Sequence, residues 1–322
     1  MQPKISVALC TFNGEKFIRE QIDSLLNQTL QINEIIVCDD CSTDETIAIL
    51  KEYALNHPGL FFIHQNEKNL RSVKNFEKAI SLCTGDFIFL SDQDDIWVAD
   101  KAADFLDYFE KHPKISVLAS NGYCIDGKSE ILERYTFWDI PEFLRTTKKP
   151  FSYYTIMTSI SNLATGATMA LRKEFLSEVL PFPLVNLHHD EWIAIIASKI
   201  NAFELLNKKY IYYRLHENQQ VGGISFRKNN AVRKKLTEVY DVYNFDTSFK
   251  NFRKRLRKLV LSHKKDLLLR DKVEKYSDDF SDNAQNIRKL YELTKAAMKK
   301  KYAVSFRILT LIDNLGRQKY RL

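Results

Sequence analysis

Three aspartates, Asp92, Asp94 and Asp95, closely follow the apolar run Phe-Ile-Phe-Leu at 87–90. The run is short, β-prone and preceded by a Gly-Asp pair, which predicts a buried strand. A strand that ends this way places carboxylates at the carboxyl edge of a sheet, where open α/β sheets bind their ligands. Two carboxylates one residue apart can hold a hard divalent cation, which in turn can hold a diphosphate. The alternative for this motif taken alone is an acidic turn that caps the following helix.

Two further polar clusters follow predicted strands in the same way. Strand 5–9 is followed by Cys-Thr-Phe-Asn-Gly at 10–14, and strand 34–38 is followed by Asp-Asp-Cys-Ser-Thr-Asp at 39–44. Because the carboxyl ends of parallel strands meet at one edge of a sheet, we expect all three clusters to lie together. Carboxylates can accept hydrogen bonds from a base or a ribose, so this edge suits a nucleotide. Neither G-x-G-x-x-G nor G-x-x-x-x-G-K-[ST] is present, which disfavours a dinucleotide site and a P-loop site.

The elements that must position these clusters alternate between strand and helix over the first 120 residues. Apolar runs and amphipathic stretches predict strands at 5–9, 34–38, 60–64, 87–90 and 115–119 and helices at 15–27, 44–55, 73–83 and 99–111. This alternation predicts an α/β fold with a doubly wound, mostly parallel sheet. After residue 226 the pattern changes to long charged helices, at about 228–245, 247–268, 283–300 and 303–315. We therefore predict a first domain at 1–225 and a C-terminal helical appendage at 226–322.

Charge is distributed unevenly along the 322 residues, of which 45% are hydrophobic and 28% charged. Residues 227–322 carry 26 Lys and Arg against 11 Asp and Glu, whereas residues 1–226 carry 22 against 30. Such a basic tail suits nucleic acid, an anionic membrane surface or an acidic partner. No apolar run is long enough to span a membrane, and the N-terminal residues lack a signal-peptide pattern. We therefore expect a cytoplasmic protein, with peripheral attachment to the inner face of the cell membrane as a second expectation.

Six stretches in colinear order resemble the family-two glycosyltransferases of GT-A fold. They are ISVALCTFNGEKFIREQIDSLLNQT, EIIVCDDCSTDET, GDFIFLSDQDDIW, TGATMAL, HHDEW and YYRLHEN. The resemblance covers about residues 3–225 and is nearest to bacterial polysaccharide enzymes of the rhamnosyltransferase-like type. It implies a GT-A catalytic domain that moves a hexose or deoxyhexose from a nucleotide-diphosphate sugar to a hydroxyl of a glycan or lipid-linked acceptor, in bacterial surface polysaccharide synthesis. It also implies Mg²⁺ or Mn²⁺ as the cofactor.

The resemblance implies a role for each position that matches a motif of the family. The positions expected to bind the donor nucleotide are Thr11, Phe12, Asn13, Asp39, Asp40, Arg71 and Asp92. Asp92 and Asp94 would form the D-x-D unit, Asp94 reaching the metal and Asp92 the ribose or the metal. His216 falls where some members place a histidine that contacts the metal or the diphosphate, and it is equally compatible with a structural role. Arg71 departs from the family's frequent Asn-x-Gly pattern, and it is either a phosphate contact or a solvated loop residue.

The segment His-His-Asp-Glu-Trp at 188–192 matches the place where the family keeps its catalytic base. Asp190 aligns with that base, and Glu191 is the competing choice. Inverting transfer needs such a base, and partial burial can raise the pKa of a carboxyl group to suit the task. The alternative role for Asp190 is N-capping of the helix that follows. Gly166 would allow close backbone approach to donor or acceptor, and Glu191 and Trp192 are expected near the sugars.

Other classes of protein remain as alternatives at this point. A nucleotidyltransferase also uses an α/β sheet and paired acids, but residues 10–14 lack the glycine-rich, basic loop that it needs. A non-catalytic binding protein could use the basic tail alone. No recognisable nucleic-acid module is present, so we expect no nucleic-acid partner. Within the tail, the segment 252–260 mixes cations with apolar residues in a way that suits an anionic lipid surface.

Overall fold

The computed structural model describes residues 3–185, 187–217, 225–315, 319–320 and 322. The chain forms two compact units. Unit 1 comprises residues 1–142, 163–182 and 187–228, and unit 2 comprises residues 143–162, 183–186 and 229–322. Within the described ranges, no helix has the length and apolar character needed to cross a bilayer.

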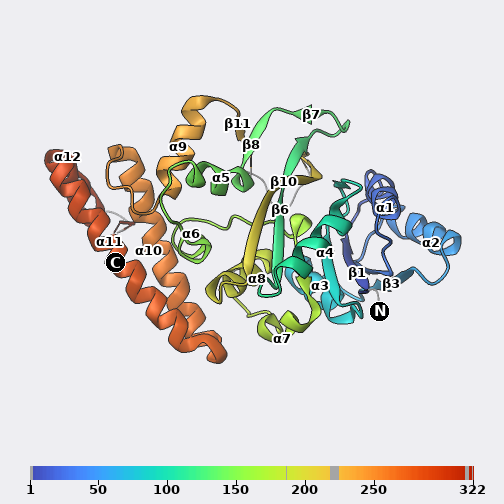
Figure 1. Ribbon diagram of the computed structural model, residues 1–322. Helices are drawn as coiled ribbons and strands as arrows, with labels where there is room; N and C mark the ends of the chain where they lie inside the picture. Colours follow the sequence, from blue (N-terminus) through green and yellow to red (C-terminus); the bar gives the residue numbers. More distant parts are fainter. Residues whose placement is uncertain (1–2, 186, 218–224, 316–318, 321) are drawn as a thin grey trace. The chain divides into compact units, whose positions relative to one another are not determined.

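Unit 1 is built on a mixed, mostly parallel sheet (Figure 1). Its described strands are β1 (Ile5–Thr11), β2 (Glu34–Asp39), β3 (Phe61–Gln65), β4 (Phe87–Ser91), β5 (Ile96–Trp97), β6 (Val117–Ile125), β7 (Ile131–Leu132), β9 (Ala170–Arg172) and β10 (Phe203–Arg214). The sheet order is β3-β2-β1-β4-β9-β6-β10-β5, with β7 paired to β6. The neighbours of β1 and β2 are parallel, as is the β6–β10 pair, whereas β9, β5 and β7 pair antiparallel with their neighbours. A separate two-stranded ribbon joins β8 (Arg134–Thr136) to β11 (Ser225–Arg227).

Helices pack on this sheet and bury its central strands. They are α1 (Ile18–Leu26), α2 (Thr46–Asn56), α3 (Arg71–Leu82), α4 (Lys101–Lys111), α7 (Leu176–Val179) and α8 (His189–Lys199), with the 3₁₀ turns η1 (Phe137–Asp139), η2 (Gly166–Thr168) and η3 (Lys173–Phe175). Helix α3 packs on β1 and β2, and α8 packs on β6 and β10. Every residue of β1, β2 and β4 is buried, as expected for strands of a parallel sheet covered on both faces.

The structure confirms the predicted α/β sheet and corrects several of its details. The apolar runs at 203–206 and 210–213, whose pattern alone predicts two short strands, form one strand, β10, with irregular register against β6 around Leu206, Lys209 and Tyr212. The short strand β5 was not predicted. The stretch 121–165, which has no clear periodicity, contains the end of β6, the strands β7 and β8, and two short helices, α5 (Ile140–Arg145) and α6 (Tyr153–Ser159).

Unit 2 is helical. Its described helices are α6, α9 (Asn230–Tyr240), α10 (Phe249–Lys272), α11 (Ser277–Lys301) and α12 (Ala303–Leu315), with the 3₁₀ turn η4 (Glu274–Tyr276) before α11 and the last residues of α5, which crosses the boundary from unit 1. Helices α10 and α11 pack along each other, α6 contacts α10, and α12 contacts α11 (Figure 1). The unit therefore includes a segment from the middle of the sequence as well as the C-terminal helices.

The segment 252–260 of α10 lies in the core of unit 2, which corrects its interpretation as a lipid-facing segment. Phe252, Leu256, Leu259 and Val260 are each at most 2% exposed. Arg255 is also buried, and its guanidinium donates hydrogen bonds to three carbonyl oxygens at the end of α9 and just after it, those of Glu238, Asp241 and Asn244. The apolar residues of this segment are therefore the packing face of α10, and one of its cations satisfies a helix C-terminus.

Candidate active site

The sheet register aligns the ends of the three strands that carry the polar clusters. Thr11 at the end of β1 lies opposite Asp39 at the end of β2, and Leu9 lies opposite Ser91 at the end of β4. The loops that follow these strands therefore leave the sheet at one edge, as predicted from the alternating pattern. All residues described below belong to unit 1.

Asp39 orders the loops that follow β1 and β2. Its carboxylate accepts hydrogen bonds from Thr11 Oγ1 at 2.8 Å, Ser42 N at 2.9 Å and Ser42 Oγ at 2.5 Å. Ser42 Oγ in turn accepts the N–H of Asn13, which has a left-handed backbone with φ of 48°. Asp39 and Thr11 are at most 2% exposed, so both side chains shape the loop from within.

Asp40 holds the start of α3. Its Oδ1 accepts the Leu70 N–H at 2.7 Å, its Oδ2 accepts the Arg71 N–H at 2.8 Å, and Asn66 Nδ2 donates to Oδ1 at 2.9 Å. Arg71 has φ of 63°, and its side chain is exposed. The structure thus joins Asp40 to the loop 66–71 and leaves the Arg71 guanidinium at the surface, where it can meet a phosphate or solvent.

Gln93, the middle residue of the D-x-D unit, joins that unit to the end of β1. Its side-chain amide accepts the Phe12 N–H at 2.7 Å and donates to the Phe12 carbonyl at 2.9 Å. A Cβ on Gly14 would lie 2.3 Å from Gln93 Oε1, so a larger residue at position 14 would displace the Gln93 amide. The Phe12 ring is 40% exposed beside this contact. No sequence motif indicates this role of Gln93, because its partner is 81 positions away.

Asp94 and His216 form a pair at the centre of the site. His216 Nε2 lies 2.8 Å from Asp94 Oδ2, and both side chains are less than a fifth exposed. The His216 ring also contacts the Phe17 ring, with 5.2 Å between their centroids. The structure therefore brings together two of the three residues predicted to bind metal, although they are 122 positions apart in sequence.

Arg214, two residues before His216, holds the loop that carries Asp94. Its side chain is fully buried. Its Nε donates to the Asp94 carbonyl at 2.7 Å, and its backbone N–H donates to Asp95 Oδ1 at 2.9 Å. Its other guanidinium nitrogens donate to Glu20 Oε2 at 2.9 Å, Ser129 Oγ at 2.9 Å and the Asp126 carbonyl at 3.2 Å. One side chain thus ties the D-x-D loop to α1 and to the turn after β6. No sequence motif indicates this role of Arg214.

The acidic groups and the lysine in this part of the site are buried or half-buried. Burial, together with the charges of Asp94 and Asp190, raises the pKa of Asp92 to about 7. Burial also raises the pKa of Asp95, whose Oδ2 has no hydrogen-bond partner among the described residues. Lys101 faces both carboxylates, and burial lowers its pKa to about 7. The site therefore concentrates acidic groups that resist ionisation, and a bound cation would favour their ionised form.

Lys101 also links the acidic cluster to the Gly166 turn. Its Nζ donates to the Ala167 carbonyl in η2 at 2.8 Å and lies 3.7 Å from the centroid of the Trp97 ring. The side chain is fully buried. A buried lysine at this position offsets part of the charge of the aspartates and fixes the backbone of η2 at the same time.

Asp190 lies at the start of α8, next to Gly166. The Gly166 N–H donates to Asp190 Oδ2 at 3.1 Å, and the Glu191 N–H donates to Asp190 Oδ1 at 2.6 Å. Burial raises the pKa of Asp190 to about 6. The N-cap residue of α8 is His188, so Asp190 does not occupy the N-cap position that was its alternative role. Asp190 is close enough to Asp92 for the two charges to interact.

The neighbours of Asp190 differ in what they can contact. Glu191 is half-buried. Trp192 is 2% exposed, and its indole N–H donates to the Val179 carbonyl at 2.9 Å, so it lies in the core and is not available to stack on a sugar. His189 is also buried, stacked on Phe76, and neither of its ring nitrogens has a hydrogen-bond partner among the residues described. The prediction of a sugar contact at Trp192 is therefore wrong.

The donor atoms at the centre of the site fit a divalent cation. The Asp94 carboxylate and the His216 imidazole are close enough for one ion to bind both, and Mn²⁺ or Mg²⁺ accepts carboxylate oxygens, Mn²⁺ also imidazole nitrogen. In the described part of the chain, no group of three or more His, Cys, Asp or Glu side chains converges as a complete metal site. The protein therefore offers a partial donor set, which suits an ion that also binds a diphosphate.

Comparison with known proteins decides the family. The model of the family described as Glycosyl transferase family 2 matches residues 6–180. The chain belongs to glycosyl transferase family 2. This membership confirms the predicted glycosyltransferase and removes the nucleotidyltransferase alternative. It also confirms the resemblance stated from the sequence motifs.

Curated relatives and solved structures agree with this assignment. The dTDP-rhamnosyl transferase RfbG of Shigella flexneri is 28% identical over 267 residues, covering 76% of this chain and 86% of the relative. The Escherichia coli chondroitin synthase is 31% identical over 193 residues, which cover 57% of this chain and 28% of that much longer protein.

Two solved structures share the fold. The S. aureus TarS 1–349 structure, in complex with UDP-GlcNAc, has a TM-score of 0.52 at 17% identity and covers 90% of this chain and 92% of TarS 1–349. The mannosyltransferase PcManGT of Pyrobaculum calidifontis, in complex with GDP-Man and Mn²⁺, has a TM-score of 0.54 at 17% identity and covers 94% of this chain and 74% of its own. At this identity the two structures confirm the fold.

Proposed function

We propose that this glycosyltransferase moves a hexose or deoxyhexose, with inversion, from a nucleotide-diphosphate sugar to a hydroxyl of a glycan or lipid-linked acceptor. The observation that carries the proposal is the position of Asp190, whose carboxylate accepts the Gly166 N–H of η2. Lys101, which interacts with Asp92, donates to the Ala167 carbonyl of the same turn, so η2 links Asp190 to the D-x-D unit. A base on one side and a diphosphate-binding group on the other are the two parts that inverting transfer needs. The catalytic domain would comprise residues 1–225.

Asp190 would accept the proton of the acceptor hydroxyl. The acceptor oxygen attacks the anomeric carbon as the bond from that carbon to the diphosphate oxygen breaks, and the bonding electrons leave with the diphosphate. The N–H groups of Gly166 and Glu191 hold both carboxylate oxygens of Asp190 in place, which keeps the base oriented toward the acceptor. Because burial raises the pKa of this carboxyl to about 6, Asp190 is a stronger base than an exposed aspartate and is still ionised at neutral pH.

Asp94 and His216 would hold a divalent cation, and Asp92 would contact the cation or the ribose. When bound, Mg²⁺ or Mn²⁺ would neutralise the charge that develops on the departing diphosphate. The presence of Mn²⁺ with GDP-Man in the PcManGT structure supports metal use. The exposed Phe12 ring and the loops held by Asp39 and Asp40 would form the nucleotide side of the site.

A curated relative and the charge of the C-terminal region support the proposed acceptor and biological role. The relationship to a dTDP-rhamnosyl transferase supports a role in bacterial surface polysaccharide synthesis. The basic region 226–322 would bring the enzyme to an anionic membrane surface on the cytoplasmic side, where a lipid-linked acceptor would be reached. UDP, dTDP and GDP sugars are the donor classes to compare, since UDP-GlcNAc and GDP-Man occupy the related structures.

Calorimetry with these donors tests the proposal. The wild type should bind one donor class in the presence of Mg²⁺ or Mn²⁺ and lose most of that affinity when the cation is chelated. Asp94→Ala should abolish cation-dependent binding, because it removes the carboxylate beside His216. Asp107→Ala changes an exposed aspartate on α4 and serves as the matched control. Donor binding by folded Asp94→Ala with undiminished cation dependence would contradict the assignment.

A further inference from the structure

Helix α12 carries an apolar stripe that no other part of unit 2 covers among the described residues. Val304, Ile308, Leu311 and Ile312 are 73%, 53%, 63% and 62% exposed. The spacing of three and four residues places all four on one face of the helix. Leu309, on another face, is 8% exposed and anchors the helix to the unit. Four large apolar side chains in one exposed stripe exceed the scattered exposure that is normal at a protein surface.

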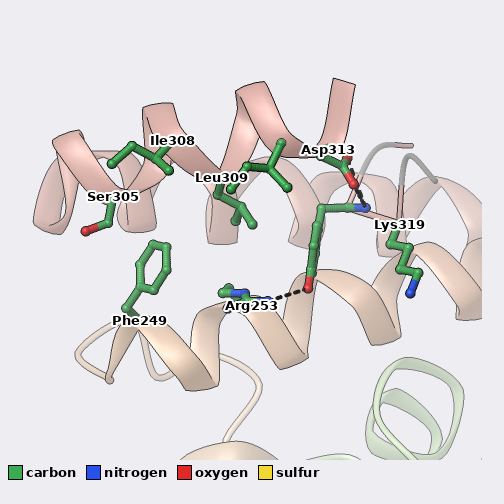
Figure 2. Close-up of a pocket in the computed structure, with 9 residues that line it drawn as sticks. Phe249, Arg253, Ser305, Ile308, Leu309, Asp313 and Lys319 are labelled. Carbon is green, nitrogen blue, oxygen red and sulfur yellow. Dashed lines mark hydrogen bonds between the residues drawn. The ribbon is translucent and has the colours of Figure 1, made fainter. Parts of the chain in front are cut away.

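An apolar groove lies along the same helix. It has a volume of about 490 Å³ and is lined by residues of α10, α12 and the segment that follows, namely Phe249, Arg253, Ser305, Ile308, Leu309, Ile312, Asp313, Lys319 and Tyr320. Figure 2 shows Phe249 of α10 pointing toward α12. Arg253 donates to Tyr320 Oη at 3.0 Å, which holds one cation at the edge of the groove. The stripe and the groove share Ile308 and Ile312, so they form one continuous surface, the α12 surface.

Exposed cations lie on α12, at the end of α11 and beside the groove. Lys299 and Lys300 are exposed at the end of α11, Arg307 is exposed on α12, and Lys319 is exposed beside the groove. Lys301 is also exposed, but it is paired with Asp246. In the sequence, residues 299–322 contain seven Lys or Arg and a single acidic residue, Asp313. An apolar stripe bordered by cations is complementary to a bilayer with anionic headgroups, because the side chains enter the acyl boundary and the cations remain among the phosphates.

We propose that the α12 surface docks on an anionic phospholipid bilayer, with Val304, Ile308, Leu311 and Ile312 entering the headgroup–acyl boundary. The attachment is peripheral, since a helix of 13 residues is too short to span a bilayer. This proposal deepens the membrane association given under the proposed function by naming the surface, and it moves that surface from 252–260 to α12. The lipid-binding chemistry is independent of glycosyl transfer, so each can fail without the other.

Co-sedimentation of the full chain with vesicles tests the proposal. The wild type should bind vesicles that contain phosphatidylglycerol, bind phosphatidylcholine vesicles much less, and dissociate as salt rises. The double variant Ile308→Gln/Leu311→Gln should bind vesicles with an affinity at least about tenfold lower, because complete burial of one apolar side chain raises an affinity by more than about tenfold. Glutamine keeps a high helix propensity, so α12 should persist. Lys299→Gln/Lys300→Gln should weaken binding mainly at low salt.

Matched controls distinguish binding through the α12 surface from non-specific apolar and electrostatic binding by other exposed side chains. Leu261→Gln/Leu268→Gln removes two leucines of α10 that are 58% and 45% exposed, and it should leave vesicle binding unchanged. Lys254→Gln/Arg257→Gln removes two exposed cations of α10 that do not line the groove. It should therefore have a smaller effect than Lys299→Gln/Lys300→Gln.

Two results would overturn the proposal. The first is equal vesicle binding by the wild type and Ile308→Gln/Leu311→Gln. The second is a wild type that ignores anionic vesicles but self-associates through α12, shown by light scattering of a dimer that this double variant abolishes. Cation-dependent hydrolysis of the sugar donor in solution, measured on the same samples, should be unaffected by the α12 substitutions. If the wild type shows no such hydrolysis, the result counts against the proposed function and not against lipid docking.

Discussion

The pH dependence of transfer offers the most direct check on Asp190. The base must be ionised to accept the acceptor proton, and burial raises its pKa to about 6. Activity should therefore rise with pH through 6, and kcat/KM at about pH 5 should be roughly tenfold below its plateau, since only about a tenth of the carboxyl is ionised one unit below its pKa. Asp190→Asn should lower transfer by about a hundredfold or more and remove this inflection.

The measurement needs conditions in which Asp190 is the group that titrates. Asp92, with a pKa of about 7, would otherwise titrate in the same range. Saturating divalent cation avoids this, because a nearby positive charge favours the ionised carboxylate and lowers its pKa. Donor affinity, measured by calorimetry, should be nearly the same for the wild type and Asp190→Asn, since Asp190 acts on the acceptor.

Glu191→Gln is the matched control, one position along the same helix. It should retain the inflection and most of the activity. If Glu191→Gln is inactive and Asp190→Asn is active, the base has been assigned one position too early. An unchanged inflection near pH 6 in Asp190→Asn would refute the reasoning from burial.

Two further predictions concern residues that do not contact substrate. Arg214→Met should raise the donor KM at least about tenfold, because it removes the hydrogen bonds that hold the Asp94 carbonyl and the Glu20 side chain. Arg214→Lys should recover part of the loss. Steady-state kinetics in which both variants match the wild-type KM would contradict this role. Asp266 of α10 is fully buried, and burial raises its pKa to about 7. Its ionisation therefore destabilises the folded state, and this destabilisation grows as pH rises from about 4, the pKa in the unfolded chain, to about 7. Asp266→Asn should therefore raise the free energy of unfolding at pH 8, by at most on the order of 4 kcal/mol, and should hardly change it at about pH 4. Urea unfolding that shows the same increase at both pH values would contradict this prediction.

The sheet and the main acids were predictable because their signals are local. The runs at β1, β2 and β4 are apolar at nearly every position, which is typical of a strand buried on both faces, and the acids follow them at once. The parallel arrangement then required the loops to meet. His216 and Asp190 were found through motifs of the family, since nothing in their immediate sequence shows that they lie near Asp94 and Asp92.

The residues that support the site were missed because their partners are distant in sequence. Arg214 is 120 positions from Asp94, and Gln93 is 81 positions from Phe12. A lone arginine or glutamine carries no periodicity, so only the folded structure shows that each is bonded on several sides. Trp192 was misassigned for a related reason: its motif lies at the site, but the turn of α8 directs the ring into the core.

The segment 252–260 shows a limit of pattern analysis in helices. Cations mixed with apolar residues describe an amphipathic helix, but the pattern does not say whether its apolar face meets lipid or protein. In α10 that face meets protein, and Arg255 is inside because three carbonyl oxygens bind it. The exposed apolar residues of α12 have no comparable cover among the described residues of unit 2.

Unit 2 combines segments that are far apart in the sequence, which affects the order in which the protein folds during translation. Helix α6 packs on α10, and Lys258 of α10 donates to the Ile160 carbonyl, a bond between residues 98 positions apart. At synthesis rates of roughly 5–20 residues per second, the buried side chains of α6, such as Ile156 and Met157, wait roughly 5–20 s before their partner helix is translated. During that interval the apolar side chains of α6 lack their partner helix, while the later part of unit 1 is still being translated. Truncation before α10 would make this exposure permanent, so a shortened catalytic domain should keep α10 or replace the apolar face of α6.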